Sequence, residues 1–165
     1  MRAITLTQPW STLVAIGAKR IETRSWPTSY RGRFAIHAGK GPASYGWQYL
    51  QHLCRSVEPF RTVLAPLIHD GHVAERLPLG AIVATAELVD CVPTRLLVEC
   101  KGLGRFTQAG IPAAWELTEQ ERAFGNYEDG RFAWLLDDVR PLATPIPARG
   151  AQGLWRWTPP AGAEL

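Results

Sequence analysis

The segment 80–92 (GAIVATAELVDCV) constrains the fold more than any other part of the chain. Its apolar residues occupy both odd and even positions, whereas a strand with one face in water alternates apolar and polar residues. We therefore predict a strand that is covered on both faces, as in the interior of a sheet or a small barrel. Such a strand needs neighbours on either side, so the rest of the chain has to supply several more strands.

Five other segments have the composition and spacing of strands, and they lie at residues 2–6, 20–26, 33–38, 131–139 and 154–158. Helical patterns lie at residues 8–17, 44–55 and 118–124. Thr7 is expected to cap the first helix and Gly17 to end it, while Thr118 and Glu121 are expected to form a capping box for the last one. Strands and helices do not alternate regularly, which argues against a doubly wound sheet. We predict an α+β fold, a small mixed β-barrel of five to six strands with flanking helices.

The length of 165 residues and the mass of 18.3 kDa fit one domain. Apolar residues make up 46% and charged residues 20%, which excludes a disordered tail, a collagen-like repeat and a coiled coil. No stretch approaches the roughly 20 apolar residues of a membrane helix, and the N-terminus lacks the pattern of a signal peptide. We therefore expect a cytoplasmic protein with no membrane partner.

Metal and cofactor sites have little support in the sequence. Cys54, Cys91 and Cys100 are odd in number and have no C-x-x-C spacing, which argues against a disulfide framework and a zinc site. His69 and His72 stand in a proline-rich loop without further ligands nearby, so solvated histidines are the favoured interpretation. A P-loop, a G-x-S-x-G motif, a G-x-G-x-x-G motif after a strand and a zinc-deaminase signature are all absent. We predict no metal and no cofactor.

The basic residues are concentrated in the first third of the chain. Residues 1–61 hold nine Lys and Arg against two acidic residues, a balance of +7, whereas residues 62–165 hold nine against thirteen, a balance of −4. Fifteen of the eighteen basic residues are arginine, which binds phosphate through two hydrogen bonds and stacks on bases. Codon usage in a genome rich in G and C would raise arginine in both parts equally, so the asymmetry favours an anionic partner.

The segment 17–26 (GAKRIETRSW) carries the most informative side chains. In a strand, Arg20, Glu22, Arg24 and Trp26 share one face, while Ile21 and its alternate neighbours face inward. Glu22 between two arginines would be held ionised and would fix their guanidinium planes, as in a reader of anions or base edges. The structural alternative is a solvated strand face held by salt bridges.

Two neighbouring features favour nucleic acid over that alternative. Trp26 belongs to the charged face, and the sequence Tyr-Arg-Gly-Arg follows at 30–33, which gives arginines interleaved with aromatic rings. Strict alternation places Lys19 on the side of Ile21, unless the turn after the first helix redirects it. His37 lies beside the same basic segment, where it is either an acid or base or a histidine with satisfied hydrogen bonds.

Gly17, Lys19, Glu22 and Arg24 form the pattern G-x-K-x-x-E-x-R, here called the signature. In this pattern the chain resembles the ASCH domain family, named after the activating signal cointegrator. Further segments resemble the family in the same order along nearly the whole chain, at residues 6–10, 31–33, 80–91, 124–134 and 147–155. The resemblance implies one PUA-like β-barrel domain over 1–158, with insertions near 42–78 and 94–116 and a loose tail at 159–165.

PUA-like domains commonly bind RNA, and the resemblance implies that the signature lines a cleft for single-stranded or modified RNA, with DNA as the alternative polymer. In this cleft the arginines would contact phosphates or base edges and the aromatic rings would stack on bases. The residues implied as contacts are Lys19, Glu22, Arg24, Trp26, Arg31, Arg33, Trp10, Tyr127 and Arg131. A protein-interaction module is a further interpretation, and it would show no salt-dependent binding of RNA.

Some members of the family resemble enzymes, which gives a hydrolase as the alternative function. In one branch, which removes acetyl from N4-acetylcytidine, a lysine matching Lys19 works with a threonine three residues later and a distant glutamate. Here Glu22 stands in the place of that threonine, and Thr23 is one position off. A ribonuclease on single-stranded RNA would use Lys19 with Tyr30 or Ser25 as acid and base. Lys19 is therefore the predicted catalytic residue if the protein is an enzyme.

Overall fold

The structure is a computed structural model that describes residues 1–42, 46–68, 73–99 and 117–165. The chain divides into two compact units. Unit 1 comprises Met1–Ala18, Arg33–Glu87 and Asp138–Leu165, and unit 2 comprises Lys19–Gly32 and Leu88–Asp137. Two long strands, β4 (Ala81–Pro93) and β5 (Phe132–Pro147), contribute residues to both units.

The strands of the described residues form a six-stranded sheet with the order β2-β5-β4-β3-β1-β6. The shorter strands are β1 (Arg2–Gln8), β2 (Ile21–Arg24), β3 (Gly32–Pro42) and β6 (Leu154–Arg156). β1 runs parallel to β3 and antiparallel to β6, and β2 runs antiparallel to β5, so the sheet is mixed. The predicted fold class, an α+β fold with five to six strands in a mixed sheet and flanking helices, is confirmed.

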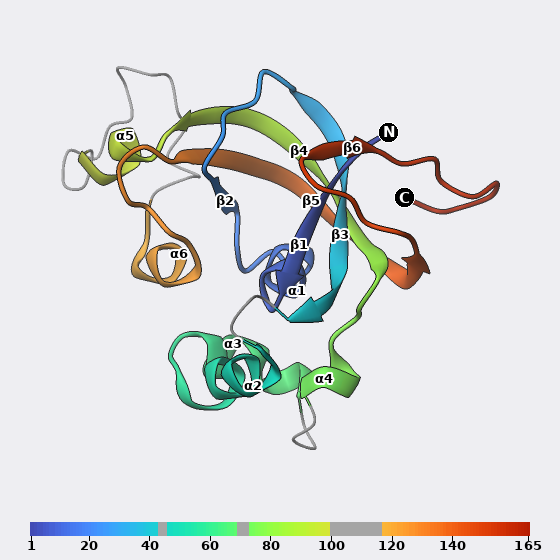
Figure 1. Ribbon diagram of the computed structural model, residues 1–165, viewed down its shortest axis with the longest axis horizontal. Coiled ribbons are helices and arrows are strands. Elements are labelled where there is room, and N and C mark those ends of the chain that lie inside the picture. Colours follow the sequence, from blue (N-terminus) through green and yellow to red (C-terminus); the bar gives the residue numbers. More distant parts are fainter. Residues whose placement is uncertain (43–45, 69–72, 100–116) are drawn as a thin grey trace. The chain divides into compact units, whose positions relative to one another are not determined.

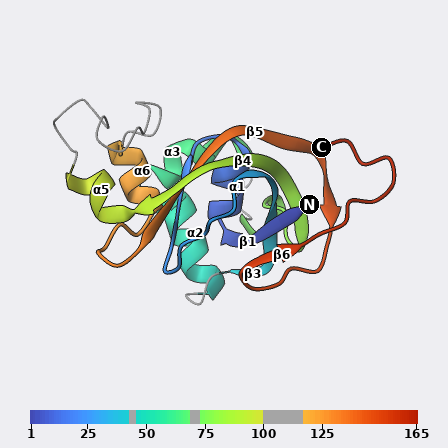
Figure 2. The same cartoon turned by 90° about the horizontal axis from the view of Figure 1, so that it is seen from above.

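In unit 1, β1 lies between β3 and β6 (Figures 1 and 2). The register pairs Ala3 with Ala35 on β3 and with Trp155 on β6. Ala3 and Ala35 are fully buried, and they form one core cluster with Ile82 and Trp157. The strands predicted at 2–6, 33–38 and 154–158 are therefore present, and β3 continues to Pro42.

The first helix, α1 (Trp10–Ala15), begins later than predicted. Pro9 is its N-cap and makes no side-chain capping bond, so the prediction of a Thr7 cap is wrong. The reason is that β1 continues through Gln8, whose Oε1 accepts a hydrogen bond of 2.9 Å from the Thr12 hydroxyl. Gly17 follows the helix with a φ of +74°, the left-handed conformation predicted for it.

The segment from 46 to 76 in unit 1 is mostly helical in its described part. It contains α2 (Gly46–Ser56), α3 (Phe60–Leu64), a short 3-10 turn (Ala65–Leu67) and α4 (Val73–Arg76). α2 and α3 pack against each other, as Figure 1 also shows. The predicted insertion at 42–78 remains a prediction, and the pair His69 and His72 lies outside the described residues.

Unit 2 is built around the pairing of β2 with β5, in which Ile21 lies opposite Leu135 and Glu22 opposite Trp134. Two short helices, α5 (Thr94–Glu99) and α6 (Glu119–Phe124), accompany these strands. The apolar core of the unit includes a cluster formed by Ile21, Val92, Leu97, Leu117, Ala133 and Leu135. The predicted insertion near 94–116 stays a prediction. Its first residues form α5, while residues 100–116 lie outside the described part.

Two further expectations for this region need correction. The capping box of α6 is only half formed, because the Thr118 hydroxyl accepts from the Glu121 N–H while the Glu121 carboxylate accepts from the N–H of Arg20. β5 was expected to end at 139, but it continues to Pro147. The fixed φ of proline suits an extended backbone, so proline interrupts a strand only where its missing N–H is needed.

Candidate nucleic-acid interface

Lys19 is the most deeply buried charged residue of the signature. It lies two residues before the start of β2 and has an exposed fraction of 0%. Its Nζ donates a hydrogen bond to the Ile21 carbonyl and lies 3.6 Å from Oε2 of Glu22. The chain before β2 thus directs the lysine to the carboxylate of Glu22, which strict alternation could not predict. The ion pair is in the protein interior, where an unpaired charge would be costly.

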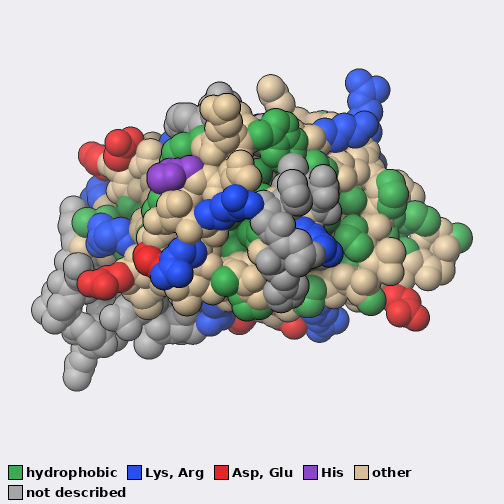
Figure 3. Space-filling model, turned by 90° about the horizontal axis from the view of Figure 1, so that it is seen from below, with side chains coloured by type: hydrophobic (Ala, Val, Ile, Leu, Met, Phe, Trp, Pro, Cys, Tyr) green, Lys and Arg blue, Asp and Glu red, His purple; other side chains and the backbone are tan. Residues whose placement is uncertain are grey.

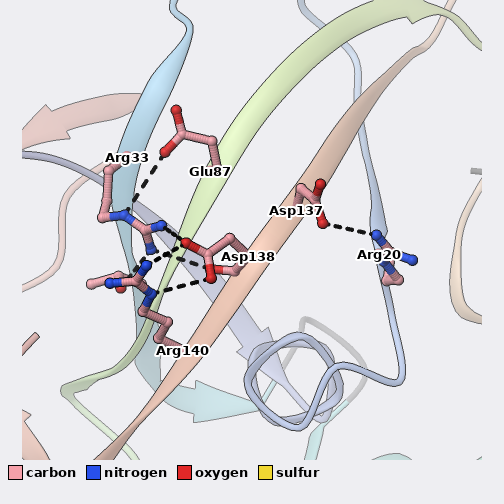
Figure 4. Close-up of polar contacts among 7 residues, drawn as sticks. Arg20, Arg33, Glu87, Asp137, Asp138 and Arg140 are labelled. Atoms are coloured by element: carbon pink, nitrogen blue, oxygen red, sulfur yellow. Dashed lines mark hydrogen bonds and ion pairs between the residues drawn. The ribbon is translucent and has the colours of Figure 1, made fainter. Parts of the chain in front are cut away.

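Glu22 joins this lysine to Arg24. Its second oxygen, Oε1, lies 3.5 Å from Nε of Arg24, and the side chains of Glu22 and Arg24 are 11% and 26% exposed. Glu22 was expected between Arg20 and Arg24, but its two cationic neighbours are Lys19 and Arg24. Arg20 precedes the strand, and its guanidinium instead pairs with Asp137 of β5 at 3.0 Å (Figure 4).

Trp26 follows the end of β2 and rests on a second tryptophan. Its ring meets that of Trp134 edge to face, with 4.7 Å between the centroids, and the Trp134 indole N–H donates to the Trp26 carbonyl. Trp134 is fully buried and lies opposite Glu22 in the strand register, so both belong to one face of the sheet. Arg24 and Trp26 are therefore partly exposed residues, each supported by a buried neighbour, Glu22 or Trp134.

Glu121 is a member of this cluster that the sequence analysis placed only in a capping box. Its exposed fraction is 6%, its Oε1 accepts from the Arg20 N–H, and its Oε2 has no hydrogen-bond partner among the described residues. Burial raises the pKa of Glu121, while the charge of Lys19 and the N–H groups of Arg20 and Ile21 lower it in part. Its position three residues after Thr118, the pattern of a capping box, was the one signal available in the sequence.

Tyr127 brings a second polar atom without a partner into the same unit. Its hydroxyl is buried and makes no hydrogen bond within the described part of the chain. Burial raises the pKa of Tyr127, and the charges of Glu121 and Glu22 raise it further. Gly125 allows the ring its position, because a Cβ there would come within 2.7 Å of the ring carbon Cε2.

Two of the arginines predicted to contact RNA, both in unit 2, donate hydrogen bonds to backbone carbonyls of neighbouring loops. Arg31 donates to the carbonyls of Thr28 and Tyr30 and pairs with Asp90 at 2.5 Å. Arg131 donates to the carbonyls of Asn126 and Thr23, each at 3.2 Å. Both arginines thus have structural partners, and their contact with nucleic acid stays a prediction.

The other two predicted contacts, Arg33 and Trp10, belong to unit 1. Arg33 pairs with Asp138, lies 3.8 Å from a Glu87 oxygen, and belongs to an ion-pair cluster with Arg140 (Figure 4). Trp10 packs edge to face on Phe60, with 6.2 Å between the ring centroids. The signature residues Lys19, Glu22 and Arg24 belong to unit 2, whereas these two residues belong to unit 1, and their joint role stays a prediction.

The remaining chemical candidates are few in the part of the chain that the structure describes. No group of three or more His, Cys, Asp and Glu side chains is placed there to hold a metal ion. Cys54 and Cys91 are free thiols, and burial raises the pKa of Cys54 to about 12. None of the described helices is long and apolar enough to cross a membrane. On the face drawn in Figure 3, Lys and Arg side chains stand in separate groups, some of them beside acidic residues.

The comparison with protein families decides the relationship of this chain. The ASCH domain model matches residues 4–134. The chain belongs to the ASCH domain family. Activating signal cointegrator 1 of Mus musculus and that of Homo sapiens are each 23% identical to it over 154 residues. This alignment covers 93% of the chain and 22% of each relative, so the chain spans about a fifth of their length.

Solved structures of ASCH proteins are also similar to this chain. The crystal structure of ASCH from Zymomonas mobilis has 18% identity and a TM-score of 0.43, and the match covers 88% of this chain and 72% of that one. A Tyr-to-Phe mutant of the same protein gives the same identity and TM-score, with 74% of its chain covered.

The ASCH signature thus has an inner and an outer part in this chain. Lys19 and Glu22 are buried and form an ion pair with each other, whereas Arg24 reaches the surface of unit 2. The sequence predicted three charged signature residues as direct contacts. Two of them, Lys19 and Glu22, form a buried ion pair, and the third, Arg24, is partly exposed.

Proposed function

We propose that this ASCH domain binds single-stranded RNA, and that Arg24 and Trp26 of unit 2 make the central contacts. The observation that carries the proposal is the support beneath these two side chains. Glu22 holds the Arg24 guanidinium from below and Trp134 holds the Trp26 ring. A fixed cation beside a fixed aromatic ring suits a strand of RNA, which offers a phosphate and an unstacked base at each nucleotide.

Lys19 and Glu22 have a positioning role in this proposal. Glu22 has two cationic neighbours, Lys19 and Arg24, so it can hold both of them in place. Because Lys19 has no exposed surface, it would act on RNA through the field it adds and through Glu22. The balance of +7 over residues 1–61 adds a longer-range attraction for a polyanion.

The test is a titration of a labelled single-stranded RNA, followed by anisotropy at low and moderate salt. Arg24→Ala should weaken binding about tenfold, and it should lower the slope of log affinity against log salt by about 0.7, the value for one phosphate contact on a single strand. Arg95→Ala is the matched control, since Arg95 is an exposed arginine on α5 of the same unit. Equal losses in both variants would contradict the assignment of Arg24.

Trp26 is tested by a substitution that keeps apolar contact with Trp134. Trp26→Leu should weaken binding by about fivefold or more with little change of the salt slope, because stacking of one base contributes about 1–3 kcal/mol. Trp47→Leu serves as the control, because Trp47 is 41% exposed on α2 of unit 1. Unchanged RNA affinity in a folded Trp26→Leu protein would remove Trp26 from the interface.

A hydrolase is the second candidate, and two buried polar atoms of unit 2 are the observation that favours it. Glu121 Oε2 and the Tyr127 hydroxyl are buried without a hydrogen-bond partner among the described residues, and Glu121 lies within the field of Lys19. A raised carboxyl pKa also suits an acid that donates a proton. The exposed fraction of 0% for Lys19 ranks this candidate below RNA binding, since a catalytic amine has to touch its substrate.

The hydrolase candidate predicts chemical change of the ligand. Incubation with single-stranded RNA followed by a denaturing gel detects cleavage, and incubation with N4-acetylcytidine followed by chromatography detects deacetylation. The hydrolase would become the first candidate if the wild-type protein and Arg95→Ala produce shortened RNA or free cytidine, and if Lys19→Met and Glu121→Gln do not. Intact RNA and nucleoside would leave binding as the function.

A further inference from the structure

Unit 1 contains a hollow that the signature does not use. Its volume is about 800 Å³, and its walls come from Thr5 of β1, from β3, from Gly80 and from the segment 147–152, which begins at the last residue of β5. It is here called the His37 hollow, because His37 is the buried titratable residue in its lining. All its lining residues belong to unit 1.

His37 forms a fixed and neutral floor. Its exposed fraction is 1%, its ring meets Trp155 edge to face at 5.7 Å, and its Nε2 lies 3.1 Å from the Ala148 carbonyl. A carbonyl only accepts, so Nε2 carries the proton and Nδ1 is left as an acceptor with no partner among the described residues. Burial lowers the pKa of His37, which keeps the ring uncharged at neutral pH.

The segment 147–152 lies directly on this floor. At Gly150 a Cβ would come within 2.4 Å of the His37 ring carbon Cε1 and 2.8 Å of the Thr5 hydroxyl oxygen. Thr5 fixes the next residue as well, since its hydroxyl donates to the Ala151 carbonyl at 2.9 Å. The position of Arg149 beside the hollow is therefore set by the backbone contacts of its neighbours.

Two cationic side chains lie at the hollow. Lys40 and Arg149 are exposed, and neither has an ion-pair or hydrogen-bond partner among the described residues. Elsewhere in unit 1, Arg33 and Arg140 pair with Asp138, and Arg61 pairs with Glu58. The described residues that line the hollow include no Asp or Glu. The hollow thus presents an excess of positive charge over a neutral floor.

The walls favour a ligand that is flat as well as anionic. Pro147, Ala148 and Ala151 supply apolar surface to the lining. The side-chain carbons of Lys40 lie across Gly80, where a Cβ would come within 2.9 Å of Cγ. A phosphate attached to a nucleoside combines the charge and the flat apolar surface that these walls match.

We propose that the His37 hollow binds the phosphate monoester of a nucleotide, with Arg149 and Lys40 as its cationic contacts. The nucleotide is either a free nucleoside monophosphate or the 5′-phosphorylated end of an RNA strand. This site goes beyond the RNA interface proposed for unit 2, because it selects a monoester with two negative charges over the diesters inside a strand.

Isothermal titration with AMP, adenosine and inorganic phosphate tests the site directly on the full chain. We expect AMP to bind at least tenfold more tightly than adenosine, and Arg149→Glu to weaken AMP at least tenfold. Arg156→Glu is the matched control, since Arg156 is an exposed arginine of β6 outside the hollow, and it should change AMP affinity less than twofold. Lys40→Met is a milder second variant that should cost about threefold.

RNA oligonucleotides with a 5′-phosphate or a 5′-hydroxyl distinguish the two sources of the monoester. Binding of AMP itself supports a free nucleotide as the ligand. A higher affinity of the 5′-phosphorylated RNA, lost in Arg149→Glu, supports the phosphorylated end of an RNA strand as the ligand. Equal affinity for AMP and adenosine, or equal losses in Arg149→Glu and Arg156→Glu, would overturn the proposal, as would absence of binding by both AMP and the 5′-phosphorylated strand. The AMP titration uses no RNA strand, so its failure and that of the unit 2 interface are distinguishable.

Discussion

The buried amine of Lys19 has a consequence for stability that can be measured. Lys19→Met replaces the charged group by an apolar side chain of similar length and leaves the carboxylates of Glu22 and Glu121 in the interior. These two residues are 8% and 6% exposed, so water can stabilise neither of them well. Breaking a buried ion pair by removing one partner costs about 3–5 kcal/mol.

The pH sets an upper limit on that cost, because a stranded carboxylate can take up a proton. A glutamate with the ordinary pKa of about 4.3 can be protonated at a free-energy cost that grows by about 1.4 kcal/mol per pH unit above this pKa. The cost is therefore about 3.7 kcal/mol at pH 7 and about 1 kcal/mol at pH 5. The lost hydrogen bond to the Ile21 carbonyl adds about 1 kcal/mol at either pH. We therefore expect Lys19→Met to lower the free energy of unfolding by about 3–5 kcal/mol at pH 7 and by about 1–2 kcal/mol at pH 5.

Urea denaturation of wild-type protein and variant at both pH values measures these differences, provided that the m-values agree. Lys40→Met is the control, because this exposed lysine has no ion-pair partner in the described part of the chain, and we expect a change within about 0.5 kcal/mol. A loss below 1 kcal/mol at pH 7, or the same loss at both pH values, would refute the reasoning. Any loss of function in a Lys19 variant has to be read against this measured stability.

Three further predictions concern single residues. Burial raises the pKa of Glu121, so the folded state holds this proton more tightly than the unfolded state, and the stability of the wild-type protein should fall as the pH rises above about 4.5. The urea midpoint of Glu121→Gln should fall less steeply with pH, and equal slopes for the two proteins would contradict this. The pKa of His37 is lowered, so wild-type stability should decrease as the pH falls below 6.5, and His37→Gln should remove that decrease, with an unchanged pH profile as the contrary result. Gly150→Ala places a Cβ within 2.4 Å of the His37 ring and should lower the free energy of unfolding by about 1–3 kcal/mol. The control Gly41→Ala places a Cβ with no atom within 4 Å and should change it by less than about 0.5 kcal/mol; equal melting temperatures of the two variants would contradict the steric overlap at Gly150.

Local pattern was sufficient for most of the strands and for part of the site. The apolar run at 80–92 predicts β4, and alternation along β2 predicts that Glu22 and Arg24 share a side. The signature spacing led to the ASCH family, which the match over residues 4–134 confirms. These features depend on residues a few positions apart, which a sequence displays directly.

The parts that could not be predicted depend on contacts over long sequence distances or on irregular backbone. The Glu121 carboxylate binds the Arg20 N–H across 101 positions, and no local pattern announces that contact. Lys19 lies between helix and strand, where neither periodicity fixes the direction of a side chain. Alternation along the strand predicts Arg20 and Arg24 equally well as ion-pair partners of Glu22. Only the structure, in which β2 pairs with β5, shows that the partner of Arg20 is Asp137.

The central claim is that a supported Arg24 on unit 2 binds single-stranded RNA. The most direct measurement is an anisotropy titration of one labelled RNA with wild-type protein, Arg24→Ala and Arg95→Ala at two salt concentrations, with the final samples run on a denaturing gel. The account predicts intact RNA, binding that weakens with salt, and a loss of about tenfold with a shallower salt slope in Arg24→Ala alone. Absence of binding at low salt, or equal affinities for wild-type protein and Arg24→Ala, would contradict it.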